Sequence, residues 1–193
     1  DFKRVYTKKD RPAILVLCGS QGSQKINTTI LQALPELLKN YDVVHQAGVD
    51  NFEEVKEAAT KILAGHEFKD RYFVEGFLDL SLFYSKVDLV ITRAGSSMFE
   101  MAVWQLPMIA IPIPENISRD QRTNAYSMAS HSIATVLEEN NLSPNILLSM
   151  IARIFESDDS YNAMLKNVSF FDNSLSAATV IAREIIRIGL SHH

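Results

Sequence analysis

Short apolar runs alternate with amphipathic stretches along most of this chain, and no other feature constrains its fold as strongly. The runs are rich in branched residues and occupy positions 13–18, 41–46, 71–76, 87–92 and 107–112. Such runs are typical of strands that are buried on both faces. Between them, segments 24–38 and 51–64 carry apolar residues at helical spacing, as crossover helices do. The alternation therefore predicts a parallel α/β sheet.

The pattern changes toward the carboxyl end of the chain. A sixth, weaker strand is predicted at 133–137, after a helix at about 120–130. From residue 143 onward the pattern is helical, with a Ser-Pro start signal and a closing helix at 174–189. We therefore expect a Rossmann-like, three-layer α/β domain with a mostly parallel sheet of about six strands.

The chain is expected to form one domain. Its 193 residues are 47% hydrophobic, which is enough for one well-packed core. We expect a linker or interdomain segment at 1–12, the domain at 13–190, and a tail or tag remnant at 191–193. Because the chain begins at Asp1 rather than at a methionine, it is expected to be a processed or truncated product.

Charge and cysteine content limit the setting of the chain. The net charge is −4 and the pI about 5.7, which argues against a nucleic-acid partner. A basic cluster at 3–11 is interpreted as a solvated linker, with contact to an anionic membrane or phosphate as the alternative. The single cysteine, Cys18, cannot form an internal disulfide, and no apolar run reaches 18 residues. A cytoplasmic setting is the simpler hypothesis.

A glycine-containing loop follows the first predicted strand and precedes a helix, where a doubly wound sheet binds phosphates. Its candidate ligand-binding residues are Gly19, Ser20, Gln21 and Gly22. The stretch is not the G-x-G-x-x-G of a dehydrogenase, and the second strand ends in H-Q-A-G at 45–48 rather than in an acidic residue. A tight turn without a ligand remains the alternative for this loop alone.

A second glycine loop follows the strand at 87–92, and its candidates are Gly95, Ser96 and Ser97. Glu100 falls about one turn into the next helix, where a carboxylate can accept both hydroxyls of a ribose. Alternatively, Glu100 interacts only with the helix dipole. Two glycine loops at the same edge of the sheet favour an anionic ligand such as a pyrophosphate.

Two further loops carry candidate residues for a base and a sugar. Phe77 can offer a flat face to a nucleobase, and the main chain at Leu78 can hydrogen-bond its edge. Sugar hydroxyls can hydrogen-bond to Asp120, Gln121 and Asn124, because these side chains combine donors and acceptors. The alternatives are a core position for Phe77 and helix-capping or exposed positions for the polar residues.

Taken together and in this order, the four stretches resemble the MurG family of N-acetylglucosaminyltransferases. C-G-S-Q-G-S resembles that family's G-G-S-Q-G-A loop with Cys18 in place of the first glycine, and H-Q-A-G resembles its H-Q-x-G segment. R-A-G-S-S-M-F-E is one residue shorter between glycine and glutamate than the family's pattern. The resemblance extends from about Ala13 to Leu190 and covers only the family's carboxy-terminal half, one half of a GT-B fold.

The resemblance implies roles for matching residues. Phe77 and Leu78 would lie at uracil, Glu100 at the ribose, and Gln121 near the N-acetylglucosamine hydroxyls. Ser20, Gly22, Ser96 and Ser97 would lie beside the pyrophosphate. It also implies an inverting N-acetylglucosaminyltransferase of lipid II synthesis, whose catalytic base is expected in the missing amino-terminal half, so that this chain alone is inactive. No metal or cofactor is expected, since no D-x-D cluster appears.

The implied partners are UDP-N-acetylglucosamine, an amino-terminal acceptor domain or subunit and, through it, a lipid-linked acceptor. The full-length protein would be peripheral at the inner face of the plasma membrane. Three alternatives remain open: a stand-alone donor subunit of a split glycosyltransferase, a nucleotide-sugar hydrolase or epimerase module, and glycine loops that are only structural.

Overall fold

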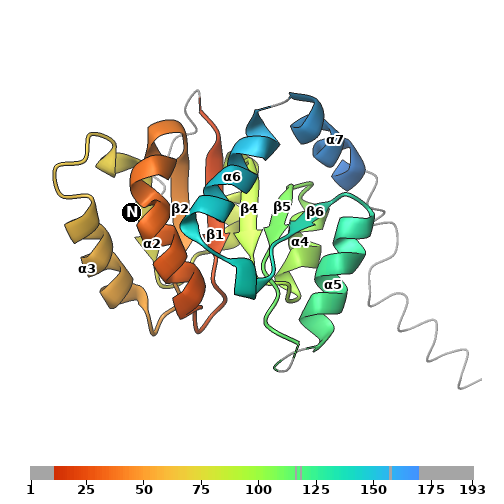
Figure 1. The fold of residues 1–193 in the computed structure, drawn as a ribbon, viewed down its shortest axis with the longest axis horizontal. Helices are drawn as coiled ribbons and strands as arrows, with labels where there is room; N and C mark the ends of the chain where they lie inside the picture. The colour runs from red at the N-terminus through yellow and green to blue at the C-terminus, as the bar shows by residue number, and fades with distance from the viewer. Residues whose placement is uncertain (1–10, 116, 118, 157, 170–193) are drawn as a thin grey trace, which may run out of the picture.

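The computed structural model describes residues 11–115, 117, 119–156 and 158–169, and its centre is a six-stranded parallel sheet. The strand order is β3-β2-β1-β4-β5-β6 (Figure 1). The strands are β1 (Ala13–Leu17), β2 (Asp42–Gln46), β3 (Tyr72–Glu75), β4 (Leu89–Thr92), β5 (Met108–Ala110) and β6 (Ala134–Val136). The predicted six-stranded α/β sheet is confirmed.

The helices lie where the amphipathic segments predict them. They are α2 (Gln24–Asn40), α3 (Phe52–Ile62), α4 (Ser97–Val103), α5 (Arg119–Ser130), α6 (Pro144–Phe155) and α7 (Asp158–Ser169). Four short 3₁₀ turns complete the described chain: η1 (Lys69–Arg71), η2 (Leu80–Leu82), η3 (Tyr84–Lys86) and η4 (Glu139–Asn141). The predicted closing helix at 174–189, most of the linker at 1–12 and the tail at 191–193 lie outside the described residues.

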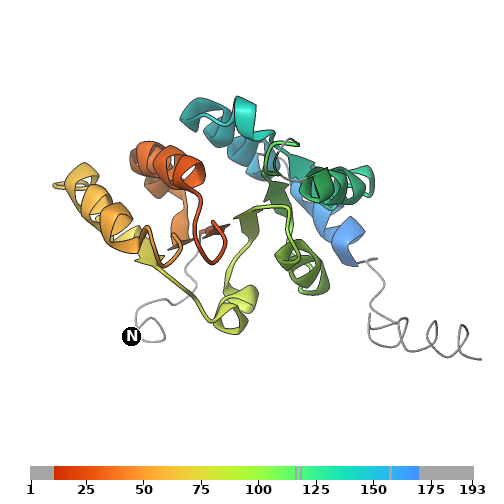
Figure 2. The same ribbon diagram turned by 90° about the horizontal axis from the view of Figure 1, so that it is seen from below.

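Each face of the sheet is covered by its own apolar layer, as successive strand residues point to opposite faces. In β1, Ile14 and Val16 pack with apolar residues of α2, α3 and α6, and Leu15 and Leu17 pack with those of α4, α5 and η3. Figure 2 shows α2 and α6 on one side of the sheet and α4 on the other. This burial on both faces explains why the strand segments lack a polar–apolar alternation.

Helix starts are set by local signals in the sequence. The Ser23 hydroxyl caps α2 by accepting from the Ile26 amide at 3.4 Å. Ser143 caps α6 in the same way, and Pro144 occupies the first turn, where its missing N–H costs nothing. Among the described helices, none is both long and apolar enough to cross a membrane.

The strand order places a switch point between β1 and β4. From β1 the chain proceeds outward to β2 and β3, and then returns to form β4 on the other side of β1. The connections that follow β1 and β4 therefore leave the sheet in opposite directions and open a crevice at its carboxyl edge, where open α/β sheets bind ligands. Both predicted glycine loops lie at this edge.

Candidate functional site

A cavity of about 480 Å³ lies at the carboxyl ends of β1 and β4. Several of its lining residues are those predicted from the two glycine loops and the polar loop after β5: Gly19, Ser20, Gln21, Gly22, Gly95, Ser96, Ser97 and Gln121. Residues that are distant in sequence thus converge on one site. Gly19 and Gly22 adopt φ angles of +87° and +89°, a backbone conformation that glycine reaches without strain.

Arg93 is the one charged side chain among the lining residues, and none of them is acidic. Its guanidinium donates to the Ser23 hydroxyl at 2.5 Å and to the Ile111 carbonyl at 3.4 Å. The guanidinium also forms an ion pair with Glu139. The described residues contain no cluster of His, Cys, Asp and Glu that could hold a metal ion. The cavity therefore offers hydroxyls, amides and a fixed cation.

The loop after β1 is anchored by the last residue of β2 and by the segment that follows it. Three successive carbonyl oxygens of this loop accept hydrogen bonds: Gly19 from Gln46 Nε2 at 3.4 Å, Ser20 from the Val49 amide at 3.2 Å, and Gln21 from Asn51 Nδ2 at 2.8 Å. Carbonyl oxygens would repel an anionic ligand, and here these oxygens are occupied by other donors. This arrangement favours anion binding by the loop.

A buried polar cluster lies beneath the same loop. His45 is fully buried, its Nε2–H donates to Asn27 Oδ1 at 2.9 Å, and its Nδ1 accepts from the Tyr72 hydroxyl at 2.8 Å. Asn27 Nδ2 donates to the Ala47 carbonyl, and the Cys18 thiol donates to Asn27 Oδ1 at 3.0 Å. Burial lowers the pKa of His45 to about 3. The cluster is thus neutral and joins the start of α2 to β2 and β3.

Glu100 lies on α4 with its side chain exposed, and it does not line the cavity itself. Its Oε2 accepts a hydrogen bond from the Tyr84 hydroxyl at 3.2 Å. The Tyr84 ring packs against Trp104, with ring centroids 4.8 Å apart. Glu100 thus has one described partner and presents the rest of its carboxylate to solvent.

Phe77 and Leu78 follow β3 and differ sharply in exposure. The Phe77 side chain is 67% exposed, so it is not part of the core, whereas the Leu78 side chain is buried. The Leu78 amide donates to Gln46 Oε1 at 3.0 Å. Gln46 therefore connects the loop after β1 to the loop after β3.

The residues predicted to bind a sugar do not all lie at the cavity. Gln121 lines the cavity, and its Oε1 accepts from the Ile113 amide at 3.3 Å. Asn124 Nδ2 donates to the Ala94 carbonyl at 3.3 Å, so it supports the second glycine loop. Asp120 is exposed on α5. Of these three, Gln121 alone is among the cavity-lining residues.

Seven lining residues were not among the predicted binding residues: Leu17, Cys18, Gln46, Leu80, Thr92, Arg93 and Ile113. For Gln46 and Arg93 a signal existed, because both are polar residues at strand ends beside a glycine loop. Leu80 and Ile113 carry no such signal in the sequence. Their position follows from the path of the chain after β3 and β5.

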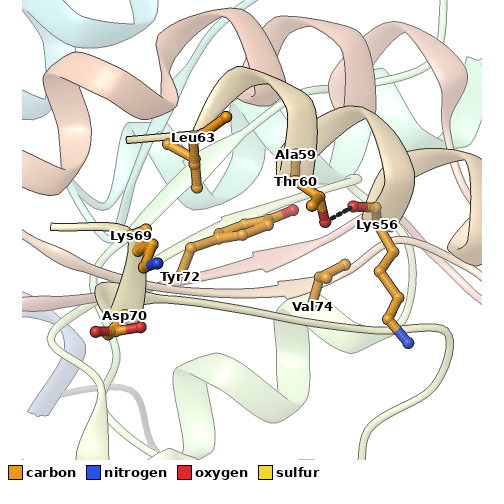
Figure 3. Close-up of a pocket in the computed structure, with 9 residues that line it drawn as sticks. Lys56, Ala59, Thr60, Leu63, Lys69, Asp70, Tyr72 and Val74 are labelled. Carbon is orange, nitrogen blue, oxygen red and sulfur yellow. Dashed lines mark hydrogen bonds between the residues drawn. The ribbon is translucent and has the colours of Figure 1, made fainter. Parts of the chain in front are cut away.

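A separate hollow of about 380 Å³ lies between α3 and the edge strand β3 (Figure 3). Its lining includes Lys56, Leu63 and Lys69, and the ring of Tyr72 lies within it (Figure 3). None of the predicted binding residues lines this hollow. It is therefore distinct from the crevice at the strand ends.

Comparison with known sequences and structures finds several related proteins. The model of the glycosyltransferase family 28 C-terminal domain matches residues 13–183. A Bacillus thuringiensis protein named UDP-N-acetylglucosamine–N-acetylmuramyl-(pentapeptide) pyrophosphoryl-undecaprenol N-acetylglucosamine transferase 3 is 34% identical over 160 residues. That match covers 82% of this chain and 43% of the relative. A transferase of the same name from Oceanobacillus iheyensis, without the number, is 32% identical over 185 residues, covering 93% of this chain and 48% of the relative.

The fold has a matching solved structure in MurG of Acinetobacter baumannii, with a TM-score of 0.68 and 22% sequence identity. The match covers 84% of this chain and 46% of that one. The chain therefore spans less than half the length of these curated relatives and of this solved neighbour.

Proposed function

The chain is a member of the glycosyltransferase family 28 C-terminal domain family, and we propose that it binds the nucleotide-sugar donor UDP-N-acetylglucosamine in the crevice between β1 and β4. One observation carries the proposal above all others. Two glycine- and hydroxyl-containing loops and a fixed arginine converge on a cavity without a lining carboxylate, at the switch point of the sheet.

The pyrophosphate is assigned to the loops at 19–22 and 95–97. Ser20, Ser96 and Ser97 supply hydroxyl donors, and α2 begins just beyond the first loop with no acidic residue in its first turn. A 17-residue helix directs its positive end and unpaired amides toward this loop. Arg93 adds a guanidinium that is held by Ser23 and Ile111 and by an ion pair with Glu139, which offsets part of its positive charge. These groups together favour a doubly charged anion.

The nucleoside and the sugar are assigned to the two ends of the crevice. Phe77 offers an exposed ring for a base, and Glu100 offers carboxylate oxygens for ribose hydroxyls. Gln121, in the cavity, suits the hydroxyls of the sugar. Leu78 has its amide bonded to Gln46, so its main-chain contribution to base binding would come from its carbonyl.

In the reaction proposed for the full-length protein, an acceptor hydroxyl attacks the anomeric carbon and the bond from that carbon to UDP breaks with inversion. Negative charge grows on the departing pyrophosphate, where the hydroxyls, amides and Arg93 would stabilise it. The catalytic base and the lipid-linked acceptor belong to the amino-terminal half. We propose that residues 13–190 form the donor domain, and that the full-length protein acts at the cytoplasmic face of the plasma membrane in lipid II synthesis.

Calorimetric titration with UDP tests this function on the 193-residue chain. We expect the parent to bind UDP in preference to ADP, and Glu100→Ala to bind UDP about tenfold more weakly, which corresponds to about 1.4 kcal/mol. Glu57→Ala is the matched control, because Glu57 is an exposed glutamate on α3 paired with Lys61. Absence of UDP binding would contradict the proposal. Isomerisation or hydrolysis of UDP-N-acetylglucosamine by the chain alone would favour an epimerase or hydrolase.

A further inference from the structure

Tyr84 contacts Glu100, in the first turn of α4, and Trp104, which lies one turn later at the carboxyl cap of that helix. Its hydroxyl donates to Glu100 Oε2 at 3.2 Å, and its ring packs on Trp104 with a centroid separation of 4.8 Å and an interplanar angle of 35°. The Trp104 amide in turn donates to the Glu100 carbonyl at 3.1 Å. A single tyrosine rotamer therefore makes both contacts with α4.

Packing against the apolar core fixes the position of Tyr84. Its side chain is largely buried and belongs to the apolar layer that includes Met98 and Met101 of α4. Tyr84 lies in η3, on the connection that leads from the base loop at 77–78 to β4. It thus joins the segment proposed to hold the base to the helix proposed to hold the ribose.

The tyrosine keeps its proton at neutral pH. Burial, together with the hydrogen bond and the negative charge of Glu100 and the charge of Asp79, raises the pKa of Tyr84 to about 12. The hydroxyl is therefore the donor and the carboxylate the acceptor. A carboxylate has about four acceptor positions, so one bond from Tyr84 leaves the others available to a ligand.

We propose that Tyr84 is a positioning residue, which holds the Glu100 carboxylate in the orientation that binds the ribose hydroxyls of the nucleotide. This inference rests on the proposed function, since it assigns a supporting residue to the same site. An exposed glutamate otherwise samples several rotamers, and ordering it on binding costs side-chain conformational entropy. Tyr84 would reduce that cost before the ligand arrives.

The test compares UDP with 2′-deoxy-UDP in the parent and in Tyr84→Phe, by calorimetry on the full 193-residue chain. The variant retains the ring and its packing on Trp104, and it removes only the hydroxyl. We expect the parent to prefer UDP by about tenfold and the variant by about twofold, because without the Tyr84 hydrogen bond the Glu100 carboxylate is no longer held toward the 2′-hydroxyl. A variant that merely loosened the fold would weaken both ligands equally.

A double-mutant cycle with Glu100→Gln locates the effect. In the Glu100→Gln background, we expect Tyr84→Phe to cause no further change in the preference for UDP. Tyr126→Phe is the matched control, since it also removes a tyrosine–glutamate hydrogen bond, the one from Tyr126 to Glu138 at 2.9 Å. Trp104 is the only tryptophan of the chain, so its fluorescence reports on folding and on this contact in every variant.

The possible results separate the two proposals. If the parent binds UDP and Tyr84→Phe keeps the tenfold preference, the positioning role is overturned and the donor site stands. The same holds if Tyr84→Phe lowers the preference equally with and without Glu100. A parent that does not bind UDP contradicts the proposed function and the inference together.

Discussion

Gly48 packs its backbone directly against the backbone of Gly22. A β-carbon on Gly48 would overlap the amide nitrogen and Cα of Gly22, and it would lie 2.6 Å from the carbonyl carbon of Gln21. Both glycines have φ near +90°, which side chains rarely adopt. The loop after β1 therefore has its shape because the loop after β2 touches it with no side chain between them.

Gly48→Ala should therefore destabilise the chain and distort the crevice. We expect a loss of about 2–4 kcal/mol in the free energy of unfolding, from backbone strain and overpacking together. Urea unfolding followed by Trp104 fluorescence measures it. Gly65→Ala is the control, since Gly65 also has positive φ but has no atom near its β-carbon position. Equal losses in the two variants would show that the Gly22 contact contributes nothing.

The buried His45 should make stability depend on pH. Its folded pKa of about 3 lies below its unfolded value of about 6.5, so the unfolded chain binds the extra proton first. The contribution of His45 to the free energy of unfolding is complete above pH 6.5. It declines as the pH falls toward 3, and about 2 kcal/mol of it is lost at pH 5. His45→Gln should show a flatter profile between pH 7 and pH 5 in urea unfolding. The exposed His131→Gln should keep the parent's slope.

Arg93 should contribute to binding of the pyrophosphate and not of the nucleoside. We expect Arg93→Met to weaken UDP about tenfold and to leave the affinity for uridine within twofold, because uridine carries no phosphate. The variant leaves Glu139 without its ion-pair partner, so Arg93→Met is also combined with Glu139→Gln. Calorimetry with both ligands checks the prediction. Equal weakening of UDP and uridine would assign Arg93 a structural role.

The Cys18 thiol should be unreactive in the folded chain. Burial raises its pKa to about 12, despite a backbone hydrogen bond involving Ser23 and the charge of Arg93, which act in the opposite direction. At pH 8 we expect iodoacetamide to modify the native chain far more slowly than the urea-unfolded chain, as measured by mass spectrometry. Equally fast modification of the two states would contradict the buried position of Cys18.

The sequence predicted the parallel sheet and both glycine loops for one physical reason. In a parallel sheet the carboxyl ends of all strands share an edge, so Gly19 and Gly95 converge once the strands are recognised. The role of Gln46 was not predictable in the same way. It ends a buried strand, and only the register of β2 against β1 and β3 directs its side chain toward the loops.

The contact of Tyr84 with Glu100 is a second feature that the sequence could not predict. Tyr84 lies in a short 3₁₀ turn, where neither helical nor strand periodicity indicates which way a side chain points. Its contact with Glu100 depends on the placement of α4, a helix of seven residues whose position is set by packing against β4 and β5. Asp120 shows the converse, since it was predicted to bind sugar hydroxyls but is exposed and lies outside the cavity lining.

A crystal structure of the chain with UDP would test the central claim most directly. We predict that the pyrophosphate lies between the loop at 19–22 and the loop at 95–97, with the ribose at Glu100 and the uracil beside Phe77. UDP seated instead in the hollow between α3 and β3, or no UDP in the crevice at saturating concentration, would contradict the account.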